Sequence, residues 1–320
     1  MEQRMTRKQS GFSLLELVVV MAILAALATV ALRAVSNNQN QARYQQTTRT
    51  LTDIRDAIVG PANQRNPDGT PLITGFVADT GNLPVYYGGG DPLAELTTNP
   101  NSIGSYAPAT TSDPNLTINA GWQGPYLRLG VGASTILDGW GNPFHLYDSS
   151  GATPPSSAVA QITSWGADNN ADPSYGGTGG TTGYNADVGI KLGSSGGGVN
   201  YQATLTGSIQ IFDASNNPVV FPLASPFTWS GINAAIYVVY FGPNGGNVVE
   251  TPATVSATNG QFTVAGTIGP RVLRAYVVPF GTTWGPGVAL AAIAKSAPLN
   301  IVATGGGQTV PNLVIRNYAP

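Results

Sequence analysis

The strongest pattern in the chain is an apolar run near its N-terminus. Phe12–Leu32 is almost entirely hydrophobic, and Glu16 is the only charged residue within it. These 21 residues would form a helix about 32 Å long at roughly 1.5 Å per residue, which matches the ~30 Å hydrocarbon layer of a bilayer. Arg4, Arg7 and Lys8 precede the run, so the positive-inside rule predicts a cytoplasmic N-terminus and a translocated remainder. The pattern predicts one membrane-spanning helix.

After the apolar run, helical spacing continues to about Val59. Apolar side chains recur every three or four residues and form one stripe, while charged residues lie largely off it. No proline occurs before Pro61, so we predict one uninterrupted helix over 12–59, about 72 Å long at roughly 1.5 Å per residue. Gly60 and Pro61 form its stop signal. The stripe residues are Tyr44, Thr47, Leu51, Ile54 and Ile58.

The segment 60–192 has the composition of turns and short strands. Its first half, 61–120, is rich in Pro, Gly and Asn, and we predict a mostly solvated loop with a turn and a short helix over 79–96. A strand is expected to begin at His145 and another at Gln161. This segment is therefore predicted to supply a small antiparallel sheet on which the long helix packs.

A second region follows the Gly- and Ser-rich segment 193–200, which has the composition of a flexible linker. Over 201–320 short apolar strands alternate with turns, and Tyr237–Phe241 has almost no polar residue, as in the core of a β-sandwich. We therefore expect an α+β protein in which a separate all-β sandwich follows the helix and the small sheet. The predicted strands are Leu205–Phe212, Ala235–Phe241, Gln261–Ala265, Leu273–Val278 and Leu313–Arg316.

The position of Glu16 is unusual for a plain membrane anchor. A carboxylate in hydrocarbon costs a few kcal/mol unless it has a partner. A secretory signal would be cut after the apolar run, where helical sequence continues instead. Cleavage between Gly11 and Phe12 would create a positive α-amino group four residues before Glu16, and this group could serve as the partner.

These residues resemble the type IV pilin and pseudopilin family. Its members have a short basic leader, Gly at the cleavage site, Phe next and Glu as the fifth mature residue, all ahead of an apolar helix. The resemblance implies that residues 1–11 are a leader removed by a prepilin peptidase, which also N-methylates Phe12. It further implies that Glu16 pairs with the terminal amine of a neighbouring subunit during assembly. A plain membrane anchor is the alternative.

A second set of motifs resembles the major pseudopilin of type II secretion systems. Gly124–Leu127 (GPYL), Asp138–Phe144 (DGWGNPF), Gln161–Asp168 (QITSWGAD) and Asn185–Val188 (NADV) occur in the order of that family, although Gly139 stands where the family usually has Pro. The resemblance implies a calcium ion bound in the loop between the last strands. Its expected ligands are Asp168, Asp172 and Asp187, with Ser164 as a candidate hydroxyl, because Ca²⁺ takes hard oxygen donors. Polar turns capped by Asp are the alternative.

The C-terminal region resembles the carboxypeptidase-regulatory, transthyretin-like β-sandwich. The resemblance lies in Gly207–Asp213, Asn217–Val219, Thr258–Phe262 and Gly269–Tyr276. An unrelated immunoglobulin-like sandwich is the alternative for the same strand pattern.

Composition excludes several classes of function. The net charge of −2 and the absence of Cys argue against a nucleic-acid surface, disulfide bonds and a thiol nucleophile. The single His145 is expected to be a packed or surface residue, so we do not expect an enzyme. The five tryptophans at 122, 140, 165, 229 and 284 could form a glycan-binding face, but they are more often parts of small cores.

Two functions remain open. The first is a structural subunit that polymerises through its N-terminal helix into a pilus or pseudopilus. The second is a minor tip or adhesin-like pilin whose C-terminal region binds cargo, glycan or another pilin. Both imply the inner membrane with a periplasmic C-terminus before assembly. The expected partners are the prepilin peptidase, other pilins and an inner-membrane assembly platform.

Overall fold

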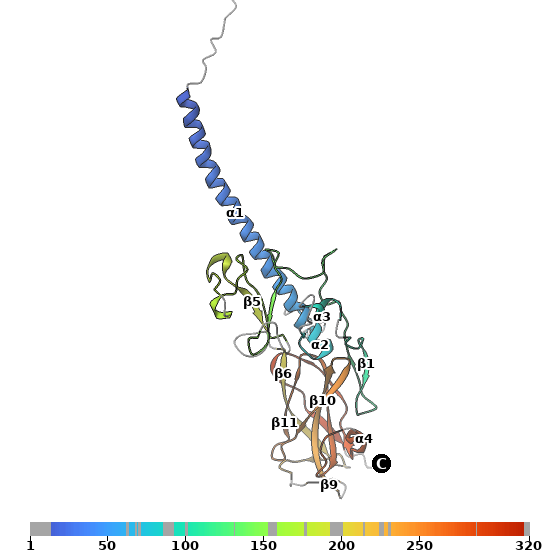
Figure 1. Ribbon diagram of the computed structural model, residues 1–320. Coiled ribbons are helices and arrows are strands. Elements are labelled where there is room, and N and C mark those ends of the chain that lie inside the picture. Colours follow the sequence, from blue (N-terminus) through green and yellow to red (C-terminus); the bar gives the residue numbers. More distant parts are fainter. Residues whose placement is uncertain are drawn as a thin grey trace, which may run out of the picture.

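The computed structural model describes most of the chain. It covers residues 14–61, 64–67, 69, 72–85, 93–99, 102–130, 132–152, 159–175, 178–192, 201–213, 215–223, 227–229, 232–285 and 287–316. The predicted leader, the cleavage site between Gly11 and Phe12 and the linker over 193–200 lie outside these residues. The described part has one long helix and several mainly antiparallel sheets (Figure 1), so the α+β class is confirmed.

The helix α1 runs without interruption over Leu14–Val59. Every residue over 14–39 is exposed, and burial of the helix begins at Thr47. The predicted stripe is confirmed, because Thr47, Leu51, Ile54 and Ile58 are buried. The helix ends as predicted at Gly60, which has φ +83° and donates its N–H to Asp56 O at 2.9 Å. The N-terminal part of α1, residues 14–39, is therefore exposed, and we call it the bare part. The C-terminal part, from Thr47 on, is packed in the protein and is called the fixed end.

A small antiparallel sheet packs on the fixed end of α1. Its strands lie in the order β3 (His145–Tyr147), β4 (Gln161–Ser164) and β5 (Val188–Lys191), and β3 and β4 begin at the predicted residues. Leu51, Ile54 and Ile58 of the helix share one hydrophobic cluster with Leu146 and Ile162 of the sheet. Two short 3-10 helices, Pro173–Tyr175 and Gly183–Asn185, lie between β4 and β5.

The prediction of a mostly solvated loop over 61–120 is wrong. This segment contains α2 (Phe76–Thr80), α3 (Ala94–Thr97) and a hairpin of β1 (Ala107–Thr110) and β2 (Thr117–Ala120). All five residues of α2 are buried, and Phe76 and Leu96 belong to the same cluster as the α1 stripe. The apolar residues that lie between the turn-forming residues of this segment therefore pack against α1.

The C-terminal β-region, residues 201–316, consists of two sheets. One has the order β10-β9-β12, with β13 and β14 along β12 and β8 along β9; the other has the order β11-β6, with β15, β16 and β7 along β6. The strands are β6 (Gln202–Phe212), β7 (Pro218–Val219), β8 (Phe227–Trp229), β9 (Ile232–Asn244), β10 (Asn247–Thr254), β11 (Gln261–Thr267), β12 (Gly269–Pro279), β13 (Ala294–Lys295), β14 (Leu299–Ala303), β15 (Gly306–Thr309) and β16 (Leu313–Arg316), with the helix α4 at Val288–Ala291. Each of the five predicted strands lies within one of these strands.

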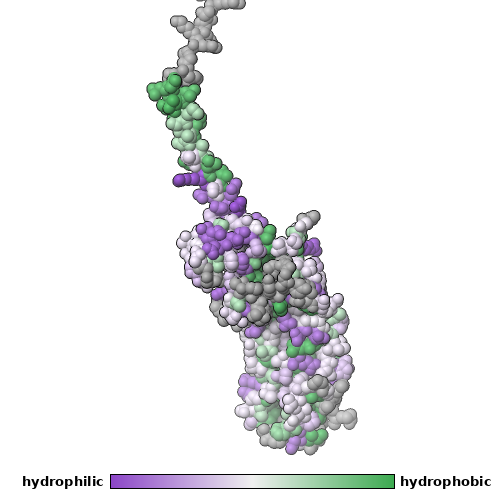
Figure 2. All heavy atoms as spheres, in the orientation of Figure 1, coloured by the Kyte–Doolittle hydropathy of each residue, from purple (hydrophilic) through white to green (hydrophobic). Residues whose placement is uncertain are grey.

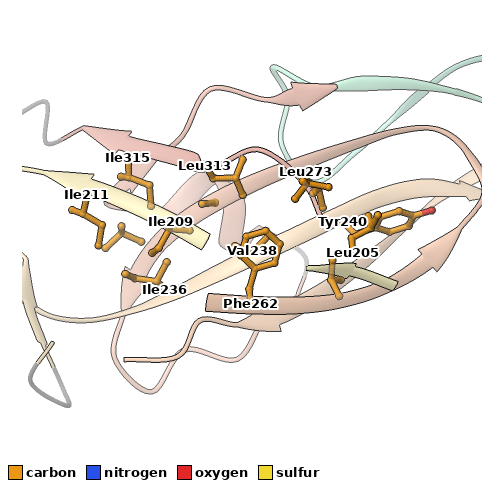
Figure 3. Packing of buried hydrophobic residues seen from close by; sticks show 14 of the residues in the cluster. Leu205, Ile209, Ile211, Ile236, Val238, Tyr240, Phe262, Leu273, Leu313 and Ile315 are labelled. Carbon is orange, nitrogen blue, oxygen red and sulfur yellow. The ribbon is translucent and has the colours of Figure 1, made fainter. Parts of the chain in front are cut away.

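The two sheets face each other across one hydrophobic cluster (Figure 3). Leu205 and Ile211 come from β6, while Val238 and Leu273 come from β9 and β12. These side chains are at most 1% exposed, so this cluster is the core of the β-region.

The sheet that contains β9 and β12 is covered on its outer face as well. Leu116 and Ile118 from the β1–β2 hairpin pack there with Val239, Phe241 and Tyr276. This second core explains the continuous apolar run of β9, because residues on both faces of the strand are buried. The hairpin belongs by sequence to the helix-proximal segment 60–192, yet it packs on the β-region.

Candidate functional site

The bare part of α1 is the most exposed apolar surface among the described residues. Leu14 is 83% exposed and Leu32 is 70% exposed. Figure 2 shows this end of the helix as a hydrophobic segment clear of the protein body, followed by hydrophilic residues where α1 enters it. Glu16 lies in the first turn of α1 and is exposed within this surface. Such a surface requires lipid or other apolar helices around it.

In the described part of the chain, α1 is the one helix long and apolar enough to cross a membrane. Its most apolar window is entirely exposed, so it is not the core helix of the protein body. Because the 46 residues of α1 span about 69 Å at ~1.5 Å each, the helix can cross a bilayer and still reach the small sheet.

Two of the predicted calcium ligands meet between β4 and β5. The backbone N–H of Asp172 donates to Asp187 Oδ2 at 3.0 Å, and the N–H of Asp187 donates to Asp172 Oδ2 at 3.1 Å. The other carboxylate oxygen of each residue, Oδ1, is buried without a hydrogen-bond partner. Burial raises the pKa of Asp187, the Asp172 N–H lowers it, and the charges of Asp172 and Asp168 raise it again. Two buried oxygens with no donor are a suitable start for a cation site.

The other two predicted ligands have partners of their own. Asp168 accepts the N–H of Asn170 at 3.3 Å and that of Gly180 at 2.9 Å. Ser164 donates its hydroxyl to Asp138 Oδ2 at 2.7 Å, on the side of the sheet that faces the Asp138 loop. Among the described residues no group of three or more His, Cys, Asp or Glu side chains forms a ready metal site.

The departure from the pseudopilin pattern at Gly139 has a structural reason. The Gly139 N–H donates to the Thr47 hydroxyl on α1 at 2.9 Å. A Cβ on Gly139 would lie 2.0 Å from the carbonyl oxygen of Arg43. The Asp138 carboxylate fixes this loop by accepting the N–H groups of Trp140 and Asn142 at 2.9 and 2.8 Å. Gly139 therefore allows the loop to contact the helix backbone directly.

We expect Gly139→Pro to detach this loop from α1. Proline removes the N–H that Thr47 accepts and places ring atoms where the Arg43 carbonyl lies, so the cost should be about 3 kcal/mol or more. Thermal unfolding of the detergent-solubilised protein measures it. Gly141→Ala is the control, because Gly141 has open space around it and costs only the strain of φ +88°. Equal melting temperatures for Gly139→Pro and the wild type would contradict this close contact.

The aromatic residues do not form one binding face. His145 is a packed residue as expected, since its ring stacks on Trp165 at 3.3 Å between centroids. Trp229 belongs to the core of the β-region, Trp122 packs on the helix cluster, and Trp284 packs beneath the hairpin. Trp122, Trp229 and Trp284 thus belong to three separate hydrophobic clusters.

No local sequence pattern predicts the contact between α2 and the β-region, which we call the joint. Arg271 of β12 is 2% exposed, and its Nη1 donates to Ala78 O at 2.9 Å and its Nη2 to Val77 O at 3.3 Å. The N–H of Gly245, in the β9–β10 turn, donates to Thr80 O at 2.7 Å. The guanidinium and the turn thus satisfy the carbonyls at the C-terminal end of α2.

A buried acid of α2 lies at this joint. Tyr126, from the GPYL motif, donates its hydroxyl to Asp79 Oδ2 at 3.0 Å. Burial raises the pKa of Asp79 to about 6, although the Tyr126 hydrogen bond and the charge of Arg271 lower it in part. A folded-state pKa above the usual one means that Asp79 contributes less to stability as the pH rises from about 4 through 6.

Two acidic residues hold the β1–β2 hairpin on the β-region. Asp113, fully buried, accepts Arg274 Nη1 at 2.7 Å and the Tyr276 hydroxyl at 3.0 Å, and Lys295 Nζ lies 3.4 Å away. In return, Glu250 of β10 accepts the N–H and the hydroxyl of Ser112 at 2.6 and 2.7 Å. These pairs join residues more than a hundred positions apart, so local sequence patterns do not reveal them.

Together, the exposed apolar helix with an acid in its first turn and the body packed on its other end define an α+β protein whose helix is compatible with membrane anchoring. Comparison with known families adds that residues 6–32 match the prokaryotic N-terminal methylation motif. The motif indicates a prepilin-type substrate for peptidase processing and supports a type IV pilin-like, structural protein. No characterised protein and no solved structure gives a significant match.

Proposed function

We propose that this protein is a structural subunit of a type IV pilus-like filament or a type II secretion pseudopilus. The observation that carries the proposal is the exposed apolar surface of α1 over residues 14–32, with Glu16 at its start. The methylation motif over 6–32 supports it. A surface of this kind is stable both in a bilayer and in a bundle of identical helices, which is what a subunit that leaves the membrane for a filament needs.

The assembly step uses the charge at Glu16. The peptidase cleaves between Gly11 and Phe12 and methylates Phe12, and the new terminal amine of one subunit pairs with Glu16 of its neighbour. In a low-dielectric bundle an ion pair favours the stagger that brings the two charges together, and a buried charge without a partner penalises other staggers. Before assembly the protein resides in the inner membrane with its C-terminus in the periplasm, where an assembly platform engages it.

Glu16→Ala should insert into the membrane normally and fail to assemble, with filament yield reduced by at least about tenfold for a pairing energy above ~1.4 kcal/mol. Leu17→Ala is the control, because Leu17 is also exposed on the bare helix (55%) and carries no charge. Membrane fractionation and the yield of sheared filaments measure the two steps. Normal filament yield from the Glu16→Ala strain would exclude the charge-pairing step.

One observation favours a minor subunit at the filament tip. The β-region lies beyond the fixed end of α1, away from the membrane-compatible end (Figure 1). In a filament built from stacked α1 helices, a body that extends along the helix axis would overlap with the next subunit toward the tip. A subunit at the tip has no such neighbour. A tip subunit of this shape would present its β-region to cargo, glycan or another pilin.

The number of copies per filament distinguishes a shaft subunit from a tip subunit. Quantitative mass spectrometry of sheared, purified filaments gives this number directly. Stoichiometric recovery supports the shaft, and about one copy per filament supports the tip.

We further propose that the loop between β4 and β5 binds calcium. The support is the pair of buried Oδ1 atoms on Asp172 and Asp187 without hydrogen-bond partners, with the Asp168 charge nearby. These carboxylates would supply the protein oxygens, and the ion would cross-link a loop that has few apolar contacts. Ser164 stays a candidate ligand, because a hydroxyl that donates its hydrogen to Asp138 still has oxygen lone pairs.

Calcium removal should destabilise the protein if this site is occupied. EGTA is expected to lower the melting temperature of the full chain in detergent, and added Ca²⁺ should restore it, because a ligand that binds only the folded state stabilises it. Asp187→Asn should abolish the response to Ca²⁺. Asp213→Asn, on an exposed turn of the β-region, should retain it. An unchanged melting temperature in EGTA would remove calcium from the loop.

A further inference from the structure

A cleft of about 680 Å³ lies between the hairpin, β12, β14 and the segment that follows β14. Arg271 is the only charged residue among the described residues that line it. Each of its three guanidinium nitrogens already donates to a protein oxygen. The cleft therefore offers uncharged polar groups to a ligand. The polar side chains of its wall include Tyr106, Thr117, Asn119, Asn300, Thr304 and Gln308.

One wall of the cleft is the strand β14, which pairs with β12 on one side only. Among the described strands, no other is hydrogen-bonded to β14. Such an edge strand presents backbone N–H and C=O groups that have no partner in the sheet. Asn300, Ile301 and Val302 of β14 all line the cleft, and Asn300 is exposed.

The register of the two strands shows which groups point outward. The pairs are Arg271 with Ile301 and Val272 with Asn300. In β12 the backbone N–H and C=O groups of the odd-numbered residues point toward β13 and β14, since Ala275 O accepts the N–H of Ser296. In an antiparallel ladder, alternate pairs exchange hydrogen bonds. The N–H and C=O groups of Asn300 and Val302 therefore point away from β12, into the cleft.

Gln308 protects part of this edge. Its Nε2 donates to Val302 O at 3.1 Å, and its Oε1 accepts the N–H of Thr304 at 3.0 Å. No hydrogen bond among the described residues involves the backbone N–H or C=O of Asn300 or the N–H of Val302. The side chains of Asn119 and Asn300 are also without hydrogen bonds in this part of the chain. These free backbone donors and acceptors on one strand edge can form hydrogen bonds with the backbone of another extended chain.

We propose that the cleft binds an extended, uncharged polypeptide segment of a partner protein, which adds as a strand to the free edge of β14. The backbone of the segment pairs with Asn300 and the Val302 N–H, and the amides of Asn119 and Asn300 contact its side chains. Backbone pairing supplies the affinity in this mode of recognition, and side-chain pockets supply the specificity. The site does not depend on filament assembly, so it stands or falls separately from the proposed function.

Asn300→Pro tests the strand edge without disturbing the sheet. The Asn300 N–H takes no part in the pairing with β12, and proline is tolerated on strand edges. It removes the donor and places a ring in the path of an added strand. Asn300→Thr is the matched control, because it changes the side chain and keeps the N–H.

The probe is a phage-displayed library of random twelve-residue peptides, selected against the detergent-solubilised full chain. We expect enrichment of uncharged sequences with alternating β-branched residues. Their affinity should fall at least about tenfold in Asn300→Pro, for the loss of one backbone hydrogen bond, and persist in Asn300→Thr. All three proteins should have the same melting temperature.

Three outcomes would overturn the proposal. The first is no enrichment above a blank surface. The second is enriched peptides that bind Asn300→Pro as tightly as the wild type. The third is binding of the same protein to a glycan array without any peptide binding, which would assign the cleft to carbohydrate.

Discussion

Asp113→Ala should destabilise the protein by about 3–5 kcal/mol, the usual cost of removing one partner from a buried charge cluster. The variant leaves Arg274 and Lys295 without the carboxylate that lies between them, and it removes the acceptor of the Tyr276 hydroxyl. It also releases the hairpin loop from the β-region. For a region of this size, the melting temperature should fall by roughly 10 °C, at ~2–4 °C for each kcal/mol.

The pH dependence of stability is a second test of the role of Asp113. Burial alone would raise the pKa of Asp113, but hydrogen bonds from Asn115 and Tyr276 and the charges of Arg274 and Lys295 outweigh it and hold the pKa below its usual value. Because the folded-state pKa is depressed, this stabilisation is complete above about pH 4 and is lost as the pH falls further. The Asp79 effect lies between about pH 4 and 6 and has the opposite sign, so the two can be separated.

Asp213→Asn is the control for Asp113. Asp213 also accepts backbone N–H groups in a turn, but it is exposed, and its replacement should change stability by less than about 1 kcal/mol. Thermal unfolding followed by tryptophan fluorescence at pH 3 to 8 measures both variants. If Asp113→Ala melts within a degree or two of Asp213→Asn, the hairpin is not held by this cluster.

Gly81→Ala should have a comparable effect at the joint between α2 and the β-region. A Cβ at Gly81 would lie 1.8 Å from the carbonyl oxygen of Pro243, and the backbone there has φ +76°. Left-handed strain of about 1–2 kcal/mol adds to an overpacking cost of about 1–3 kcal/mol. The contact between α2 and the β-region should therefore open, or the protein should lose about 2–5 kcal/mol of stability in total.

Gly281→Ala separates the clash from the backbone strain. Gly281 has a similar φ of +84°, but nothing lies within 4 Å of the position of its Cβ. It should cost only the strain of about 1–2 kcal/mol. Urea unfolding of the two variants in the same detergent gives the difference, and equal costs would show that Pro243 can move aside without penalty.

The long helix could be predicted from the sequence because its signals are local. The stripe from Tyr44 to Ile58 has helical spacing, and Gly60 and Pro61 follow its last turn. The strand Leu313–Arg316 was predicted to the residue for a similar reason, since turn-forming residues precede it. The prepilin-like motif is likewise contiguous, and the family model for N-terminal methylation matches the same short segment, residues 6–32.

The hairpin and the joint could not be predicted because their stability comes from distant residues. The strands Ala107–Thr110 and Thr117–Ala120 are too short and too polar to indicate a hairpin, and only contact with Val239 and Phe241 makes Ile118 a core residue. Arg271 gives the same lesson. In sequence it is one arginine in a strand, and in the fold it satisfies the carbonyls of a helix almost two hundred positions earlier.

The position of the hairpin also limits which shorter versions of this protein could be stable. Leu116 and Ile118 are synthesised before the strands that cover them, so their side chains stay in contact with water until those strands have been made. Any ancestor or shortened relative without the last 120 residues would have these apolar side chains open to solvent. We therefore expect relatives that end near residue 192 to have polar residues at both positions, or to lack the hairpin altogether.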